Sequence, residues 1–483
     1  MRRTLALLLV VVLALGGMVY VHASIGALTD DVTFTEEPLA GDKAWMDGYA
    51  AELSYEAAAR LKWNCRYHFG DEPRTETEFH LDQSAFSSRV QRDFDPYLDV
   101  RIGGLSIYDT TPIENYPDEL PITEIYRTAV LELNNLPDGS SLTFPITNCT
   151  DYHPYDLDLQ YWSEKIWCQA TLDGYLWQDG SSPDQQAFCR DFQSAFRFPV
   201  QPGEEAEIIR WGFPTSTCYN YDPIGIGDFG FLRQMNDAGL YLIPFYLDEN
   251  GQPLPMIAPE GRGLYFLPWK EVSQPTEVTR TFNGIEITTP DYLPDVQGMK
   301  NLLPIPDDVR VHRLELSADG TLASVLLDGP EGLELQVVEL SSGRLRSRIP
   351  VTEALPSRAY IFFGFRQDDL LVVSVSDRMA LIDLSDGSLV FETGSAEAAE
   401  LLPRFHSDQL TIRYEDGVLR LLGTVTPRYE EDERSFWLPS FVCAVFNPEG
   451  LQYLGAYHCN LDVDFNVCSW YPSNRFLPMT LTR

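Results

Sequence analysis

Residues 339–345 read Glu-Leu-Ser-Ser-Gly-Arg-Leu, and the pattern returns 44 positions later as Asp-Leu-Ser-Asp-Gly-Ser-Leu at residues 383–389. Each copy follows an alternating apolar segment and closes it with a tight turn. Upstream, residues 316–322 (Leu-Ser-Ala-Asp-Gly-Thr-Leu) place Asp-Gly between two apolar runs, which is typical of a β-hairpin. A spacing of this size is typical of β-propeller blades. The stretch therefore predicts an architecture, but it does not predict an activity.

Regular turns continue on both sides of this stretch. Residues 371–384 match residues 410–423 at an offset of about 39, and Asn-Pro-Glu-Gly at residues 447–450 supplies a further turn. A proline-marked boundary near residue 304 precedes them, so we expect regular blades over residues 301–483. About four blades are too few to close a ring.

We therefore expect residues 44–300, irregular and rich in inserts, to supply the first half of the same ring. The fold class predicted is all-β, a propeller of about seven to eight blades whose last blade is completed by an N-terminal strand. The alternative is that residues 44–300 form a separate β-sandwich.

Two phrases in the repeat region carry a resemblance. Residues 316–323 followed by residues 336–343 resemble the blade consensus of TolB-like and WD40-like propellers. The resemblance covers at most residues 309–425, and the Trp-Asp and Gly-His pairs of WD40 repeats are absent. It implies a fold and no functional residues.

The composition agrees with an all-β chain. Hydrophobic residues make up 44% of the 483 residues, and 33 Gly and 33 Pro divide the chain into short segments. Residues 61–69 alternate apolar and polar side chains, which predicts a half-buried strand. We predict one helix at residues 45–60, a hairpin around Pro137-Asp138-Gly139 with strands at residues 128–134 and 141–147, and long polar inserts at residues 109–121 and 178–186.

The formal net charge of −37 excludes some partners. A field of this sign repels nucleic acid and anionic lipid surfaces, so we expect neither as a partner. A well-solvated acidic surface is favoured over a specific cation site. We expect a monomer.

The N-terminus predicts export. Arg2 and Arg3 precede an apolar run over residues 5–21, and Val-His-Ala at residues 21–23 resembles a signal-peptidase site. Residues 1–24 are therefore a signal peptide or, if uncleaved, a membrane anchor through residues 5–21. Residues 25–43 are predicted to be an acidic linker. The rest of the chain is expected on the outer face of the membrane or secreted.

Eight cysteines follow the export signal. In an oxidising compartment an even count favours disulfide bonds, and buried thiols are the alternative. The candidates are Cys65, Cys149, Cys168, Cys189, Cys218, Cys443, Cys459 and Cys468.

One belt of aromatic and acidic side chains predicts a ligand site. Aromatic faces pack against the C–H surfaces of sugars, while carboxylates accept hydrogen bonds from sugar hydroxyls. Ordinary packing of the same residues in a strand is the favoured alternative. The candidate ligand-binding residues are Asp156, Asp158, Tyr161, Trp162, Trp167, Tyr175 and Trp177.

Two further motifs are weak. Residues 225–230 match G-x-G-x-x-G, but no strand-to-helix context surrounds them, so we predict a loop. Oxygen-bearing side chains at alternate positions over residues 460–466 resemble a calcium loop, yet Val467 stands where an EF-hand needs Gly. We therefore expect no cofactor and no metal, with calcium as the alternative.

The sequence favours a non-enzymatic binding module for protein or glycan over catalysis. Repeat rings present loops of variable length on a rigid scaffold. The alternative is an extracellular carbohydrate-active enzyme with acidic residues at the centre of the ring. Two carboxylates converging within reach of Trp162 or Trp177 would favour the enzyme.

Overall fold

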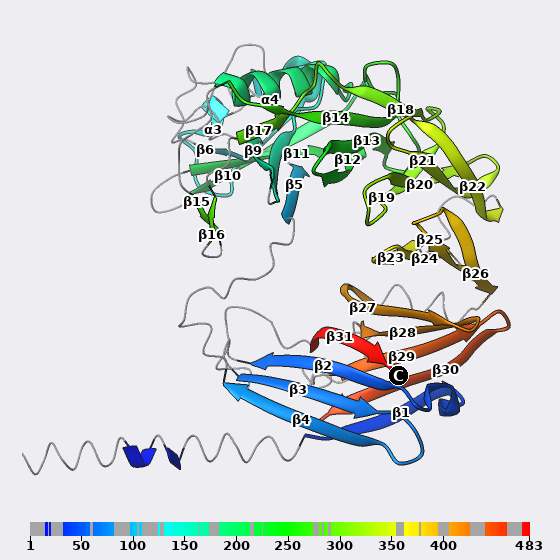
Figure 1. The fold of residues 1–483 in the computed structure, drawn as a ribbon. Coiled ribbons are helices and arrows are strands. Elements are labelled where there is room, and N and C mark those ends of the chain that lie inside the picture. Colours follow the sequence, from blue (N-terminus) through cyan, green and yellow to red (C-terminus); the bar gives the residue numbers. More distant parts are fainter. Residues whose placement is uncertain are drawn as a thin grey trace, which may run out of the picture. The chain divides into compact units, whose positions relative to one another are not determined.

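The structure is a computed structural model, and it describes much of the chain between residues 15 and 483. The described ranges are 15–17, 19–20, 32–57, 61–81, 97–103, 106–108, 124–125, 130–163, 165–172, 183–212, 217–224, 226–273, 280–282, 285–287, 291–353, 362–375, 378–394, 405–425, 440–460 and 476–483. The chain is all-β in class (Figure 1).

Two compact units divide the chain. Unit 1 consists of residues 1–90, 359–383 and 389–483, and unit 2 of residues 91–358 and 384–388. The predicted boundary near residue 300 does not coincide with a limit of either unit. Unit 1 joins the two ends of the sequence, because strands from both ends pair within its sheets.

The described residues of unit 1 form three antiparallel sheets. The sheet β31-β2-β3-β4 consists of Phe476–Thr482, Ala50–Ala57, Leu61–His68 and Arg74–Leu81. The sheet β23-β24-β25-β26 consists of Phe362–Gln367, Leu370–Val375, Arg378–Asp383 and Ser388–Gly394. The sheet β1-β30-β29-β28-β27 consists of Phe34–Gly41, Gly450–Cys459, Ser440–Asn447, Val418–Val425 and Phe405–Glu415.

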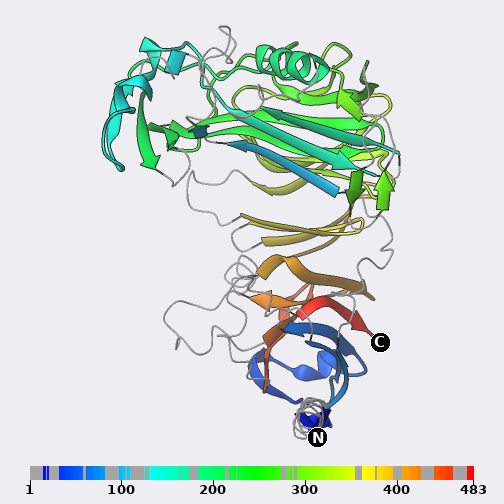
Figure 2. The same cartoon turned by 90° about the vertical axis from the view of Figure 1, so that its left-hand side faces the viewer.

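Strands from the two ends of the chain complete two of these sheets. β1 pairs with β30 over Phe34↔Cys459 to Gly41↔Tyr453, so an N-terminal strand does join the last sheet of the chain, but as a fifth strand beside β27–β30. Glu36 of β1 accepts a hydrogen bond from the Tyr453 hydroxyl at 2.9 Å. β31 pairs in the same way with β2, and Figure 2 shows the C-terminus at the end of β31.

Several local predictions for unit 1 are confirmed. Strand β3 buries Trp63, Cys65 and Tyr67 and exposes Asn64 and Arg66, which is the alternation that the sequence predicts. The turns at residues 416–417 and 448–449 each join two adjacent strands. These hairpins follow from local turn chemistry.

Two predictions near the N-terminus are wrong. The predicted helix at residues 45–60 is instead the short 3-10 helix Lys43–Met46 followed by strand β2. The predicted linker at residues 25–43 contains strand β1. Each strand gains a partner from the other end of the chain, and this pairing is invisible to local periodicity.

Within the described part of unit 2, the strands form a large sheet and three smaller ones. The large sheet β12-β13-β14-β17-β9-β8-β5, with β18 also on β14, consists of Ile226–Asn236, Gly239–Asp248, Gly263–Glu271, Asp291–Pro294, Trp167–Leu172, Asp156–Trp162, Tyr97–Gly103 and Lys300–Pro304. The sheet β6-β11-β10-β7 consists of Ser106–Tyr108, Thr217–Ile224, Glu205–Gly212 and Ser141–Pro145. The hairpin β15-β16 is Arg280–Phe282 with Ile285–Ile287, and the sheet β19-β20-β21-β22 is Arg310–Leu316, Leu322–Gly329, Gly332–Glu339 and Arg344–Glu353.

The large sheet combines two groups of four strands. β12, β13, β14 and β18 form one group and β5, β8, β9 and β17 the other, and β17 joins them because it pairs with both β14 and β9. Helix α4 (Pro183–Ala195) lies along this sheet in Figure 1, and it contacts β9 and β17. Phe188 and Phe192 of α4 are buried in the same hydrophobic core as Leu157 and Leu159 of β8.

Three predictions within unit 2 are wrong. Residues 226–230 of the glycine motif lie in strand β12 rather than in a loop, and β12 leads into β13. Where a strand is predicted at residues 128–134, the described residues 130–134 contain a helical turn, α3 (Leu131–Leu133). The insert predicted at residues 178–186 contains the start of α4. In α4 the buried Phe188 and Phe192 lie four positions apart, a helical spacing that irregular polar flanks conceal.

The cysteines do not confirm the disulfide prediction. No disulfide bond joins any two of the seven described cysteines, and six of the seven are buried. Burial raises the pKa of the Cys65 thiol to about 12. These side chains pack as small apolar groups, which is the alternative that the sequence left open. Cys468 lies outside the described residues.

The export segment lies almost entirely outside the described residues. Of the predicted signal or anchor, only residues 15–17 and 19–20 are described, and they are helical and exposed. Within the described part of the chain, no helix has both the length and the apolarity needed to cross a membrane.

Candidate functional site

The predicted ligand belt is largely built into the sheet. On β8, Leu157, Leu159 and Tyr161 are buried, while Asp156 and Asp158 lie half-buried on the other face. The Tyr161 hydroxyl donates to Asp237 at 3.0 Å. Since alternate strand residues point to opposite faces, the belt cannot present all its members together.

The remaining aromatic residues of the belt do not form a described surface. The Tyr161 ring stacks on Trp269 with centroids 5.4 Å apart. Trp167 is buried on β9. The side chain of Trp162 lies outside the described residues, as do Tyr175 and Trp177. The glycan-site hypothesis therefore stays a prediction.

A cleft of about 470 Å³ opens next to the belt, where the chain enters β8 and leaves α4. One wall is residues 149–155, and the other is the end of α4 together with Phe196 and Arg197. Backbone pairing holds these walls, because Tyr152 bridges Pro199 and Arg197 bridges Ile257. The lining residues are Glu124, Cys149, Thr150, Asp151, Tyr152, His153, Pro154, Tyr155, Arg190, Gln193, Ser194, Phe196 and Arg197.

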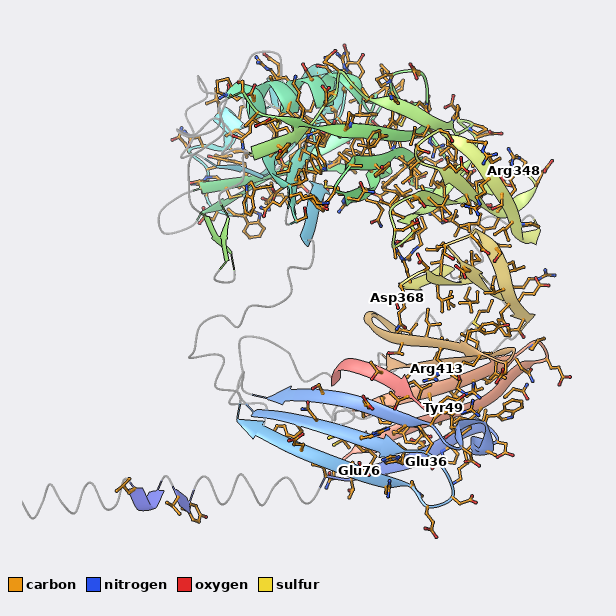
Figure 3. All side chains as sticks on the ribbon, in the orientation of Figure 1. Glu36, Tyr49, Glu76, Arg348, Asp368 and Arg413 are labelled. Atoms are coloured by element: carbon orange, nitrogen blue, oxygen red, sulfur yellow. The ribbon has the colours of Figure 1, made fainter. Side chains whose placement is uncertain are left out.

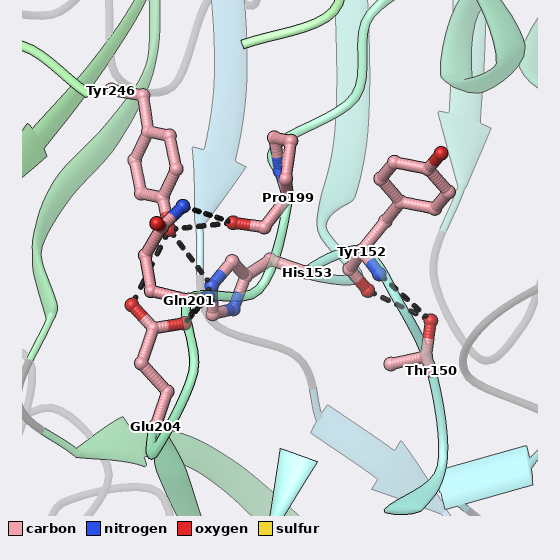
Figure 4. A network of polar contacts seen from close by, with 7 residues as sticks. All are labelled: Thr150, Tyr152, His153, Pro199, Gln201, Glu204 and Tyr246. Carbon is pink, nitrogen blue, oxygen red and sulfur yellow. Dashed lines mark hydrogen bonds and ion pairs between the residues drawn. The ribbon is translucent and has the colours of Figure 1, made fainter. Parts of the chain in front are cut away.

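A buried histidine anchors the wall formed by residues 149–155. His153 Nε2 lies 2.9 Å from Glu204 Oε2 and 3.2 Å from the Tyr246 hydroxyl (Figure 4). The same Glu204 oxygen accepts the backbone N–H of Gln201 at 2.6 Å. Tyr246 in turn donates to the carbonyl of Pro199 at 2.9 Å. The network thus joins β13, the 199–204 segment and the cleft wall.

The electrostatics of this network favour a neutral imidazole. The His153 side chain is fully buried, and burial lowers its pKa although the nearby Glu204 carboxylate opposes the shift. Nε2 then carries the proton that Glu204 accepts, and Nδ1 is buried without a hydrogen-bond partner among the described residues. Protonation of Nδ1 would place a charge where no acceptor meets it.

This geometry supports a structural role for the histidine. A histidine held by a carboxylate can serve as a general base when its other nitrogen meets a nucleophile or a substrate proton. No hydroxyl or thiol is within hydrogen-bond distance of Nδ1 in the described structure. The ring stacks on Phe229 at 5.4 Å, which fixes its plane. We therefore interpret the network as a support that sets the position of residues 150–154.

Charged groups of both signs line the solvent side of the cleft. Arg190 and Asp151 are exposed, and Arg197 is half-buried. The Arg197 guanidinium lies over the Tyr152 ring at 5.1 Å and donates to the Ser194 carbonyl at 3.1 Å. The cleft therefore offers guanidinium and carboxylate groups on a rigid wall.

No metal site emerges from the described residues. No group of three or more His, Cys, Asp or Glu side chains suited to a metal ion is found among them. Of the calcium-like pattern at residues 460–466, only Asn460 is described, and its side chain accepts the backbone N–H of Thr33 at 2.9 Å. The calcium hypothesis stays a prediction.

The sequence analysis missed His153, Glu204 and Tyr246 as a group. Glu204 lies 51 positions and Tyr246 lies 93 positions after His153 in the sequence, and none of the three belongs to a recognisable motif. The one local signal is that His153 directly precedes the aromatic belt. Only the pairing of strands brings the other two residues to it.

Comparisons with known proteins give no family. No protein-family model matches the chain, and no curated protein matches it. Three of the solved structures that are similar to this chain are a chain of the mitotic checkpoint complex, oligopeptidase B from Leishmania major and the WD40 domain of SCAP from fission yeast.

The three similarities are distant. Identities are 10%, 11% and 11%, with TM-scores of 0.23, 0.23 and 0.22. They cover 48%, 89% and 74% of this chain and 51%, 44% and 70% of the other chains, respectively. The chain thus spans about half the length of the checkpoint chain. At these TM-scores the similarities do not assign a fold or a function.

Proposed function

We propose that the protein is an exported β-propeller, membrane-tethered or secreted, that acts as a binding module. Its binding site in this proposal is the cleft between residues 149–155 and the end of α4, and its ligand is a protein segment that carries charged side chains. The observation that carries the proposal is the cleft itself, which is walled by a fixed backbone and lined by both signs of charge.

The sheet topology supports the propeller part of the proposal. Seven groups of four adjacent strands exist among the described residues: β31-β2-β3-β4, β5-β8-β9-β17, β6-β11-β10-β7, β12-β13-β14-β18, β19-β20-β21-β22, β23-β24-β25-β26 and β27-β28-β29-β30. Four-stranded sheets are the units from which propellers are built. In this proposal, each of the seven groups is one blade of the ring.

The lining favours a peptide over a sugar. A sugar ring packs on an aromatic face that is free of other groups. In the cleft, one face of Tyr152 is covered by the Arg197 guanidinium, and Tyr155 is buried with its hydroxyl donating to the Phe196 carbonyl at 3.1 Å. Guanidinium and carboxylate groups pair instead with oppositely charged side chains of a partner.

The enzyme alternative has less support. Glycoside hydrolysis needs two carboxyl groups at a set separation on either side of a sugar. The Glu204 carboxylate behind the cleft wall already accepts hydrogen bonds from His153 and Gln201. We therefore favour binding over catalysis.

The ligand class is tested by selection. A random peptide library displayed on phage is selected on the full chain, on Arg190→Glu and on Arg348→Glu, with a glycan array run in parallel. Arg348 is an exposed arginine on β22 of the same unit, so it matches the charge change away from the cleft. We expect acidic peptides to be enriched on the wild type and Arg348→Glu, and enrichment to fall about tenfold or more on Arg190→Glu.

Two outcomes would overturn this part of the proposal. Equal enrichment on both variants would place binding outside the cleft. Retention of glycans, but not peptides, in a manner that Arg190→Glu abolishes would replace the peptide with a sugar.

Export is tested separately. The apolar run at residues 5–21 behind two arginines supports it. In cells that express the full chain, added protease should degrade the protein without lysis, or the protein should appear in the medium. Full protection of the chain in intact cells, with degradation only after lysis, would contradict export.

A further inference from the structure

A second cleft, in unit 1, gathers three arginines around one tyrosine in a chain of net charge −37. The guanidinium carbons of Arg420, Arg413 and Arg483 lie 4.2, 5.4 and 5.7 Å from the centre of the Tyr49 ring. Figure 3 labels Tyr49 and Arg413 in this part of the unit. The cleft measures about 280 Å³ and is lined by Ala44, Trp45, Asp47, Tyr49, Glu415, Asp416, Val418, Arg420 and Arg483.

The pairing of strands forces two of these charges together. Arg413 on β27 and Arg420 on β28 are direct partners in the antiparallel register, and like charges in such positions are unfavourable. Arg483 follows the end of β31, where Thr482 pairs with Ala50, the neighbour of Tyr49. Three separate strands therefore deliver positive charge to one point.

The Glu415 carboxylate in this cleft already has two partners. Glu415 Oε1 lies 2.6 Å from Arg413 Nη2, and Glu415 Oε2 accepts the Tyr49 hydroxyl at 3.1 Å. The other acidic residues of the lining, Asp47 and Asp416, are exposed at the rim. Glu415 thus offsets Arg413 and leaves the other two arginines without a bonded carboxylate among the described residues.

Arg420 is the most unusual member. It is only 8% exposed, yet its Nε and Nη2 both donate to one uncharged acceptor, the Trp45 carbonyl, at 3.2 Å. Burial lowers its pKa; Tyr49 and the Glu415 carboxylate oppose this shift, while the neighbouring Arg483 and Arg413 act in the same direction as burial. A buried charge without a counter-ion is costly, and such groups are usually paired.

We propose that this cleft is an anion-binding site, in which Arg420 and Arg483 hold the oxyanion group of a ligand, a phosphate or a carboxylate, beside the Tyr49 ring. Guanidinium groups match both oxyanions through paired N–H donors. Because the whole chain repels anions, binding there depends on this local cluster rather than on the mean charge.

Isothermal titration of the full chain tests the site. Orthophosphate and acetate are titrated in separate experiments at low ionic strength, about 20 mM, where screening is weak. We expect saturable binding of at least one of them, and affinity that falls as salt is added. Binding of phosphate alone indicates a phosphate-bearing ligand, and binding of acetate alone indicates a carboxylate ligand.

Variants distinguish the cluster from the rest of the surface. Arg483 is exposed, so Arg483→Gln leaves the core intact and should weaken binding about tenfold or more. Arg420→Lys, which keeps the charge, should retain more affinity than Arg420→Gln. Arg378→Gln is the matched control, because Arg378 is an exposed arginine on β25 of the same unit. Absence of saturable binding to both anions, or equal affinity of Arg483→Gln and Arg378→Gln, would overturn the proposal.

Discussion

The sheets built from β19 to β30 and the large sheet built from β5 to β18 differ in how far apart in sequence their paired strands lie. In the first region strands pair with their neighbours in sequence, as β19-β20-β21-β22 and β23-β24-β25-β26 do. In the second, β5 pairs with β8, and β9 pairs in parallel with β17, more than a hundred residues away. Turns specify the first region, whereas the second also requires contacts between distant segments.

The difference has a thermodynamic cause. A two-residue turn closes a hairpin at little entropic cost, and its residues select the register. Joining β9 to β17 requires a long loop to close before any contact compensates for it. The large sheet therefore depends on its core, in which Phe188, Phe192 and Leu159 meet.

The largest expected effect comes from a matched pair of core truncations. Leu381 on β25 and Leu159 on β8 are both fully buried, so Leu→Ala at either position should cost about 2 to 5 kcal/mol of unfolding free energy. Hydrogen exchange followed by mass spectrometry should separate them. Leu159→Ala should accelerate exchange in β5, β9 and β17, which are scattered along the sequence.

Leu381→Ala should act more locally. We expect faster exchange in β23–β26 and in the core neighbours of Leu381 in the adjoining sheet of unit 1. Equal spread of the two effects over both units would break the comparison between the two regions. Unchanged exchange in β17 for Leu159→Ala would show that β17 does not depend on the β8 core.

The next effect concerns the polar support of the cleft. Glu204→Gln removes the charge that accepts hydrogen bonds from His153 and Gln201, and hydrogen bonds to charged groups are worth about 1.5 to 3 kcal/mol. We expect a loss of that size in chemical denaturation. Glu207→Gln on β10 is the control, because no hydrogen bond or ion pair of Glu207 is present among the described residues. If both variants lost the same unfolding free energy, the hydrogen bonds of Glu204 would not contribute more to stability than the Glu207 carboxylate does.

A pH effect of intermediate size follows from His153. Its pKa in the folded protein lies below the ordinary value of about 6.5, so the unfolded chain binds the proton more readily. Stability should therefore be complete above pH of about 6.5 and should fall as pH drops below it, by up to about 1.4 kcal/mol per unit. The groups facing the ring are Glu204, Tyr246 and Phe229.

The variant His153→Gln isolates this contribution. Its unfolding free energy, measured by urea denaturation between pH 7.5 and about 5, should vary less with pH than that of the wild type. Parallel curves for the two proteins would assign the pH dependence to other groups.

The smallest effect tests the turns of the regular region. Gly417 has φ of 76°, and an added Cβ would meet no other atom. Gly417→Ala should therefore lower the unfolding free energy only by the strain of an L-residue in the left-handed conformation, about 1 to 2 kcal/mol. Gly387 has φ of 71°, and an added Cβ would also lie 2.9 Å from Ser347 Oγ and Val337 Cγ2. Gly387→Ala should therefore lower the melting temperature more than Gly417→Ala. The reverse order would mean that the turn at residues 384–387 is not held against β21 and β22.

Local patterns predicted the hairpins well and the candidate site poorly. Asp319-Gly320 and the two copies of the Ser-x-Gly turn lie between paired strands, as expected. The helix predicted at residues 45–60 failed because β2 is completed by β31, which comes from the other end of the chain. The disulfide prediction is not confirmed: no disulfide bond joins the seven described cysteines, and six of them are buried, where a thiol packs as a small apolar group.

By itself, the sequence determined the all-β class, the turns from residue 316 onward and the acidic surface, since each depends on residues that are close together or on composition alone. The tertiary structure decided that the chain ends complete sheets, that His153 meets Glu204 and Tyr246, and that three arginines surround Tyr49. Each of these contacts joins residues that lie far apart along the chain. Their encounter is set by strand pairing and core packing, which no local pattern encodes.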